Sequence, residues 1–217
     1  TRLGAAGTSG DEAARAAIGR GFVAWEAGGL APGVALELLE AARAQPDPAL
    51  AARATAALAP PVARAIEGRA WALAGGDPAA GRLVFDTIGD CRRCHAAATG
   101  EAGGSGHGGG VGPALGGERV RDARFVLESI VDPQARIAPG FGNVEVLRRD
   151  GGRLAGRLVS RGEDGAIELD TGAARPLAIP AEAIDRVGEV QSAMPPIGLA
   201  LEPRALRDLV AYVRSLE

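Results

Sequence analysis

The chain has 217 residues, of which 47% are hydrophobic and 24% are charged, as expected for a globular protein of one large or two small domains. The net charge of −3 indicates neither nucleic-acid binding nor binding to an anionic membrane, and all 24 basic residues are arginine. No stretch approaches the roughly 18 uncharged apolar residues of a membrane span, so none is expected in this chain.

The first 74 residues indicate a helical segment behind an irregular start. Residues 1–10 are rich in Gly, Ser and Thr and are predicted to be disordered. Residues 11–74 are rich in Ala, and Gly and Pro divide them into short helices, as in a small bundle or the end of a helical repeat. They hold no polar cluster suited to catalysis, so we interpret them as a packing or linking module.

The next helix, which begins after residue 77, leads into the most informative motif of the chain. The five residues 91–95 read C-x-x-C-H, the attachment motif of c-type haem. Each thiol adds to one porphyrin vinyl group, and the histidine that follows lies under the iron, where a neutral imidazole can bind. Cys91 and Cys94 are the only cysteines. The motif therefore predicts one haem c held through Cys91 and Cys94, with His95 as the proximal metal ligand.

Three other interpretations of the motif compete with haem attachment: a redox dithiol, a zinc site and a chance match of the pattern. A C-x-x-C redox dithiol usually lies at the start of a helix that follows a strand, whereas the residues before Cys91 indicate a helix. A redox dithiol would also leave the presence of His95 a coincidence. A zinc site needs four ligands, and the only cysteines and histidines of the sequence are Cys91, Cys94, His95 and His107. Because Cys94 and His95 are adjacent, they would have difficulty reaching one tetrahedral metal together.

A glycine-dense loop over residues 96–118 follows the motif and includes the run V-G-P-A-L at residues 111–115. A helix is then predicted over residues 124–131. Residues 143–190 change to short alternating runs of apolar residues separated by turn signals, which predicts about five strands and a small β-barrel or a strongly bent sheet. Seven arginines and nine acidic residues between 143 and 192 give the wrong charge for a phosphate-binding surface.

Met194 is the predicted ligand on the second face of the iron. It is the only methionine, it stands before two prolines, and an amphipathic helix over residues 205–216 follows it. A thioether is a soft, neutral ligand, and His/Met ligation raises the reduction potential of a haem. His107, in the glycine-dense loop, is the rival ligand, although a histidine in such a loop is more often exposed to solvent.

The order of these features resembles a class I cytochrome c from residue 75 to residue 217, a mainly α fold. The distance from His95 to Met194 is much longer than in a simple domain of that class. The arrangement more specifically resembles the PVC-type haem-binding domain, a bacterial family with a small Sm-like β-barrel inserted between an I-A-P-G and an S-x-M-P motif. Here these motifs are residues 137–140 and 192–195, and the insert is residues 143–190.

The resemblance implies roles for five more residues. In this fold the first and last helices cross where small and aromatic residues interlock, here Gly81 and Phe85 against Tyr212. The proline of the G-P-x-L stretch usually accepts a hydrogen bond from the ligand histidine through its carbonyl, which implies that Pro113 orients His95. Leu115 would then line the haem pocket.

The resemblance implies a domain that carries single electrons, is not itself an enzyme and has no catalytic residues. Haem c is assembled outside the bacterial cytoplasm, so an exported protein is expected. In that family the domain usually ends a larger protein, behind a dehydrogenase-like module and helical repeats, so the partners implied are that module or a redox protein. Two alternatives stay open, a gas or redox sensor in which Met194 is displaced, and a partner-binding module with a structural haem.

Overall fold

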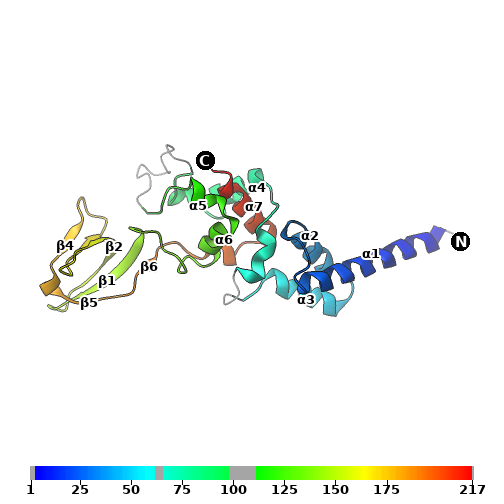
Figure 1. The fold of residues 1–217 in the computed structure, drawn as a ribbon, viewed down its shortest axis with the longest axis horizontal. Helices are drawn as coiled ribbons and strands as arrows, with labels where there is room; N and C mark the ends of the chain where they lie inside the picture. Colours follow the sequence, from blue (N-terminus) through cyan, green and yellow to red (C-terminus); the bar gives the residue numbers. More distant parts are fainter. Residues whose placement is uncertain (1–2, 62–65, 98–110, 217) are drawn as a thin grey trace. The chain divides into compact units, whose positions relative to one another are not determined.

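The computed structural model describes residues 3–61, 66–97 and 111–216 and has two compact units (Figure 1). The helical unit is built from Thr1–Asp90, Gly117–Val131 and Ile197–Leu216. The strand unit is built from Cys91–Gly116 and Asp132–Pro196. The fold is of mixed α/β class, with most helices in the N-terminal part and the strands in one antiparallel sheet.

Seven α-helices lie within the described residues, and proline at the first turn begins four of them, where its fixed φ suits the helix and its missing N–H costs nothing. An aspartate caps two of these helices and accepts backbone N–H bonds that would otherwise be unpaired. The helices are α1 (Leu3–Glu26), α2 (Pro32–Arg43), α3 (Pro48–Leu58), α4 (Pro78–Asp86), α5 (Glu118–Arg121), α6 (Ala123–Val131) and α7 (Pro203–Arg214). Short 3₁₀ turns are η2 (Glu67–Ala72), η3 (Cys91–Arg93), η4 (Ala181–Ala183) and η5 (Ile197–Leu199).

The start of the chain differs from the predicted disorder over residues 1–10. Helix α1 begins at Leu3, and residues 1–2 lie outside the described part. Once the alanine-rich turns further along have formed, each earlier residue adds to an existing helix without a new nucleation cost, so the glycines near the start do not prevent helix formation.

Helices α4 and α7 pack closely against each other in the helical unit. Gly81 lies where the two helices cross, because a Cβ at this position would be 1.9 Å from the Asp208 carbonyl oxygen and 2.7 Å from Tyr212 Cβ. Phe85 is fully buried, and its ring meets that of Tyr212 edge-on with centroids 5.3 Å apart. The predicted interlocking of Gly81 and Phe85 with Tyr212 is therefore present.

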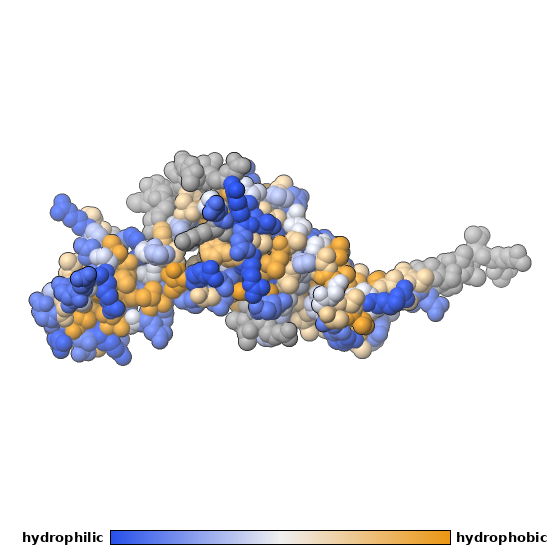
Figure 2. Space-filling view, in the orientation of Figure 1, coloured by the Kyte–Doolittle hydropathy of each residue, from blue (hydrophilic) through white to orange (hydrophobic). Residues whose placement is uncertain are grey.

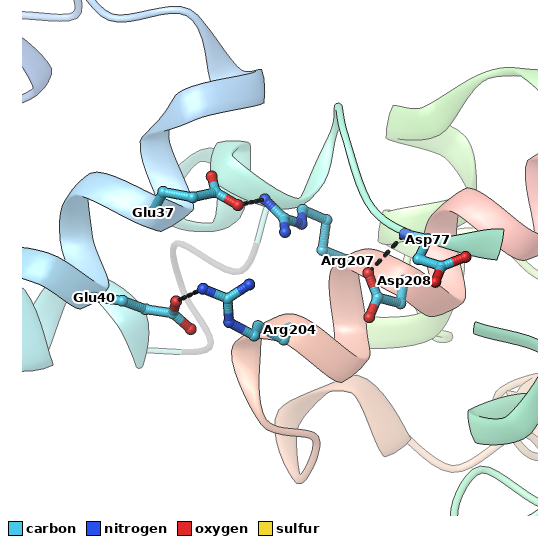
Figure 3. Close-up of polar contacts among 6 residues, drawn as sticks. All are labelled: Glu37, Glu40, Asp77, Arg204, Arg207 and Asp208. Carbon is cyan, nitrogen blue, oxygen red and sulfur yellow. Dashed lines mark hydrogen bonds and ion pairs between the residues drawn. The ribbon is translucent and has the colours of Figure 1, made fainter. Parts of the chain in front are cut away.

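Two ion pairs join α2 to α7, as Figure 3 shows. Arg207 donates to Glu37 at 2.7 Å, and Arg204 pairs with Glu40 one turn away. One residue further along α7, Asp208 accepts the N–H of Asp77 at 2.9 Å (Figure 3). The residues before and after the predicted boundary at residue 75 therefore belong to one helical unit.

The strand unit contains one sheet with the strand order β4-β3-β2-β1-β5, and β6 also pairs with β1. Its apolar residues gather on one side in a cluster that includes Val146, Ile167 and Leu169, whereas the residues between them are polar and exposed. On the face of the strands drawn in Figure 2, hydrophilic residues are interspersed with hydrophobic ones. The strands are β1 (Gly142–Arg148), β2 (Arg153–Arg161), β3 (Ile167–Asp170), β4 (Leu177–Ile179), β5 (Ile184–Val187) and β6 (Gln191–Ser192).

The prediction of a five-stranded barrel is wrong, because the sheet has six strands and is open. Strands β4 and β5 lie at opposite ends of the strand order, and no pairing joins them among the described residues. Both are short, with three and four residues, and the turn η4 between them carries the chain from one end of the sheet to the other. A barrel would need these two edges to pair along a longer stretch.

None of the helices described here combines the length and the apolar character that crossing a membrane requires.

Candidate functional site

The predicted attachment motif forms a single tight turn at the start of the strand unit. The N–H of Cys94 donates to the carbonyl of Cys91 at 3.1 Å, and the N–H of His95 donates to the same carbonyl at 2.9 Å. Residues three apart in a 3₁₀ turn are eclipsed, so both cysteines lie on one side of it. Neither cysteine is in a disulfide, and both are half-buried. The turn thus presents two thiols on one side, with a histidine directly after them.

His95 is oriented by a hydrogen bond between its ring and the backbone. Nδ1 lies 2.7 Å from the carbonyl oxygen of Pro113, and the residue is 9% exposed. A carbonyl can only accept, so Nδ1 carries the proton and the lone pair of the neutral ring is on Nε2. Burial lowers the pKa of His95 below its ordinary value, and the bond to Pro113 only partly opposes this. The ring is therefore held in the neutral form that a metal ion binds.

The segment that carries Pro113 runs beside the motif and is tied to it through the backbone. The N–H of Gly112 donates to the Cys94 carbonyl at 3.1 Å, and the N–H of Leu115 donates to the Ala96 carbonyl at 2.9 Å. Pro113 and Leu115 are both half-buried. With the histidine bond, three hydrogen bonds fix this segment against the turn. The structure thus brings together five of the predicted site residues: Cys91, Cys94, His95, Pro113 and Leu115.

Gly112 is a functional residue that the sequence reasoning passed over among the many glycines of the loop. A Cβ there would lie 2.7 Å from Cε1 and 3.0 Å from Nδ1 of His95. Real side chains do not tolerate such contacts, so only glycine leaves room for this ring position. The position of Gly112 directly before Pro113 was the signal available for it.

The substitution Gly112→Ala is expected to displace the His95 ring and break its bond to Pro113. We expect a loss of about 1–3 kcal/mol of stability, because the methyl group overpacks a site closed by backbone. Chemical denaturation measures the loss, and NMR of labelled histidine nitrogens reports whether the proton leaves Nδ1. Gly33→Ala in α2, where a Cβ meets nothing within 4 Å, is the control. A histidine spectrum unchanged by Gly112→Ala would contradict the steric role.

Met194 belongs to the same unit and is half-buried. Its N–H donates to Ser192 Oγ at 3.1 Å, and the residue is followed by two prolines. Its role as a second ligand stays a prediction.

The other predicted site residues are placed elsewhere or lie outside the described part. Phe85 and Tyr212 contact each other in the helical unit, and their predicted role beside a cofactor stays a prediction. His107, the rival ligand, falls outside the described residues. Within the described part, no group of three or more His, Cys, Asp or Glu side chains could hold a metal ion.

Comparisons with known proteins identify no family for this chain. No protein-family model matches it, and no curated protein matches it significantly. A functional assignment therefore depends on the residues and their geometry.

Proposed function

We propose that the chain is a c-type cytochrome domain that carries single electrons through one haem bound covalently by Cys91 and Cys94. The observation that carries this proposal is the buried His95 ring, whose Nδ1 is bonded to the Pro113 carbonyl, so that Nε2 carries the lone pair of the neutral ring. A redox dithiol does not need an oriented histidine beside it. The two thiols of the adjoining turn, neither of which is in a disulfide, are the matching groups for covalent attachment.

The residues of the chain fit this cofactor in their donor chemistry. Cys91 and Cys94 supply the two thiols, and His95 supplies Nε2 as the proximal ligand. The carbonyl of Pro113 fixes the tautomer of the ring and makes Nε2 more basic. Met194 supplies a soft thioether for the other face. When bound, haem c supplies a one-electron couple whose potential depends on these axial ligands and on burial.

We further propose that the chain belongs to the PVC-type haem-binding domains and that its helices form a class I cytochrome c fold. The order of the motifs supports this proposal, as does the crossing of α4 and α7 at Gly81. Such a protein is exported, because haem c is attached outside the bacterial cytoplasm. Its electrons are exchanged with a redox protein or with an upstream dehydrogenase-like module, and the chain itself has no catalytic residues.

The attachment is tested by expressing the chain in a bacterial periplasm that has the haem c maturation machinery. We expect the chain to keep its haem after denaturation in a gel, and the pyridine adduct to have the spectrum of a haem with two thioether bonds. The double variant Cys91→Ser/Cys94→Ser should keep no haem after denaturation, because serine cannot form the thioethers. A wild-type chain that releases its haem on denaturation, or takes up none, would contradict the proposal.

The assignment of the second ligand is tested by Met194→Ala with His107→Ala as the matched control. We expect Met194→Ala to change the low-spin spectrum while the haem stays covalently attached, because only the sixth ligand is lost. His107→Ala should leave both the spectrum and the attachment unchanged. The reverse pattern would assign the ligand to His107, and rapid binding of carbon monoxide to the reduced wild-type protein would favour a sensor over a carrier.

A further inference from the structure

The backbone of Ser192 is bonded on one side by the side chain of Gln134. The Ser192 N–H donates to Gln134 Oε1 at 3.1 Å, and Gln134 Nε2 donates to the Ser192 carbonyl at 3.3 Å. A primary amide presents one donor and one acceptor side by side, so it can pair with a residue as a neighbouring strand does. Gln134 lies shortly after α6, and 58 positions separate it from Ser192.

Ser192 also lies next to β1 in the sheet and is hydrogen-bonded to the methionine. It pairs with Gly142 as part of the short contact between β6 and β1. Its hydroxyl accepts the N–H of Met194 at 3.1 Å, which is a side-chain turn of the type that serine favours. Ser192 is thus hydrogen-bonded both to Gln134 and to the backbone of Met194, and it lies opposite Gly142 of the first strand.

The segment after this link has little conformational freedom of its own. Pro195 and Pro196 fix two successive φ angles and have no N–H to donate. The course of the backbone at Met194 is therefore set on its N-terminal side by Ser192 and on its C-terminal side by the prolines. Loss of the hydrogen bonds at Ser192 would therefore loosen the methionine segment on its N-terminal side, which the proline rings do not restrict.

We propose that Gln134 is a positioning residue for Met194, holding the methionine segment through Ser192 so that the thioether stays on the iron. This inference rests on the proposed function, because it needs a haem and a methionine ligand. A methionine–iron bond opens and closes reversibly. The fraction of molecules in which this bond is formed depends on how well the methionine segment is ordered before the bond forms.

The test uses the full haem-loaded chain in the oxidised state and imidazole as the competing ligand. Imidazole enters only when the thioether has left the iron, so its binding measures the open fraction. We expect Gln134→Ala to bind imidazole about tenfold more readily, because two hydrogen bonds that order the segment are lost. The absorption band that arises from sulfur bound to ferric iron should weaken in parallel. Covalent attachment of the haem should be unchanged.

Two further variants separate the two ends of the link. Gln134→Glu keeps the acceptor for the Ser192 N–H and loses the donor, so its effect should be intermediate. Ser192→Ala loses the acceptor for the Met194 N–H and should act in the same direction as Gln134→Ala. The matched control is Ser160→Ala, which removes a hydroxyl of the same unit that bonds only to Glu168 on the neighbouring strand. It should leave imidazole binding unchanged.

The outcomes distinguish this inference from the proposed function. If the wild type takes up no covalent haem, the proposed function itself has failed. If the wild type holds haem with Met194 bound, and Gln134→Ala binds imidazole as the wild type does, only the positioning role is overturned. An equal increase in Ser160→Ala would also overturn it, because the effect would then reflect general loosening of the strand unit.

Discussion

Replacing Gly81 by alanine is expected to lower the free energy of unfolding by about 3 kcal/mol or more, and the melting temperature by roughly 10 °C. The new Cβ would lie 1.9 Å from the Asp208 carbonyl oxygen and 2.5 Å from the Asp208 carbonyl carbon. These atoms belong to the backbone of α7, so no flexible side chain can move aside. The helices must separate, and the buried edge-on contact between Phe85 and Tyr212 is then lost as well.

Gly19→Ala is the matched control for this substitution. Gly19 also lies inside a helix, and a Cβ there would meet nothing within 4 Å. Alanine should stabilise that helix by about 0.5–1 kcal/mol, because it loses less conformational entropy than glycine on folding. Thermal unfolding followed by circular dichroism measures both variants. Equal stabilities of Gly81→Ala and the wild type would show that α4 and α7 do not cross at this glycine.

Replacing Arg207 by alanine is expected to cost about 2–3 kcal/mol, whereas Arg204→Ala should cost less than about 1 kcal/mol. The two arginines lie one turn apart on α7, and each pairs with a glutamate of α2. Their burial differs, because the side chain of Arg207 is 8% exposed and that of Arg204 is 57% exposed. The long buried stem of Arg207 adds packing that the exposed pair lacks.

The variant Arg207→Met separates packing from charge. Arg207 Nε is buried without a hydrogen-bond partner in the described part of the chain, so the wild-type arginine already carries a desolvation cost. Methionine keeps much of the apolar volume and removes that cost, so Arg207→Met should lie close to the wild type in stability. Denaturant unfolding of the three variants measures these differences. Equal losses in Arg207→Ala and Arg204→Ala would contradict the importance of burial.

The contribution of the Arg207 pair should also depend on pH. Burial alone would raise the pKa of Glu37, but the hydrogen bond from Arg207 and the nearby charges lower it below the ordinary value of 4.5. Because the folded state binds the proton less tightly than the unfolded state, this contribution is present above pH 4.5 and is lost as the pH falls below it. The difference between the wild type and Arg207→Ala should shrink over that acidic range.

The features predicted best from the sequence are those that depend on residues close together in the chain. The short helices before residue 75, the helix that begins after residue 77 and the strand segment all follow from local patterns. The bond between His95 and Pro113 joins residues 18 positions apart, and the resemblance to a known family supplied it. Gly81 and Tyr212 are far apart in sequence, and their contact was predicted from the same resemblance.

The features that were not predicted depend on contacts between residues that are far apart in the chain and that no sequence pattern links. Gln134 is an exposed residue without a pattern around it, and its importance arises from Ser192, 58 positions later. Arg207 was one of 24 arginines, and only the structure shows it buried against Glu37. Alternation of apolar residues predicted the strands, but it carries no information on whether the two edges of a sheet meet. The strand pattern left a small barrel and a strongly bent sheet as alternatives, the resemblance favoured the barrel, and the structure has an open sheet.

The pairing of Gly142 with Ser192 has a consequence for how this architecture can change. The segment between these two residues begins and ends at neighbouring positions. Proteins accept insertions and deletions most readily where the two ends of the inserted segment already meet. A short hairpin, or a different domain with close termini, could therefore be grafted between these two residues. The segment between Gly142 and Ser192 is therefore a natural place for new recognition elements to be acquired during evolution.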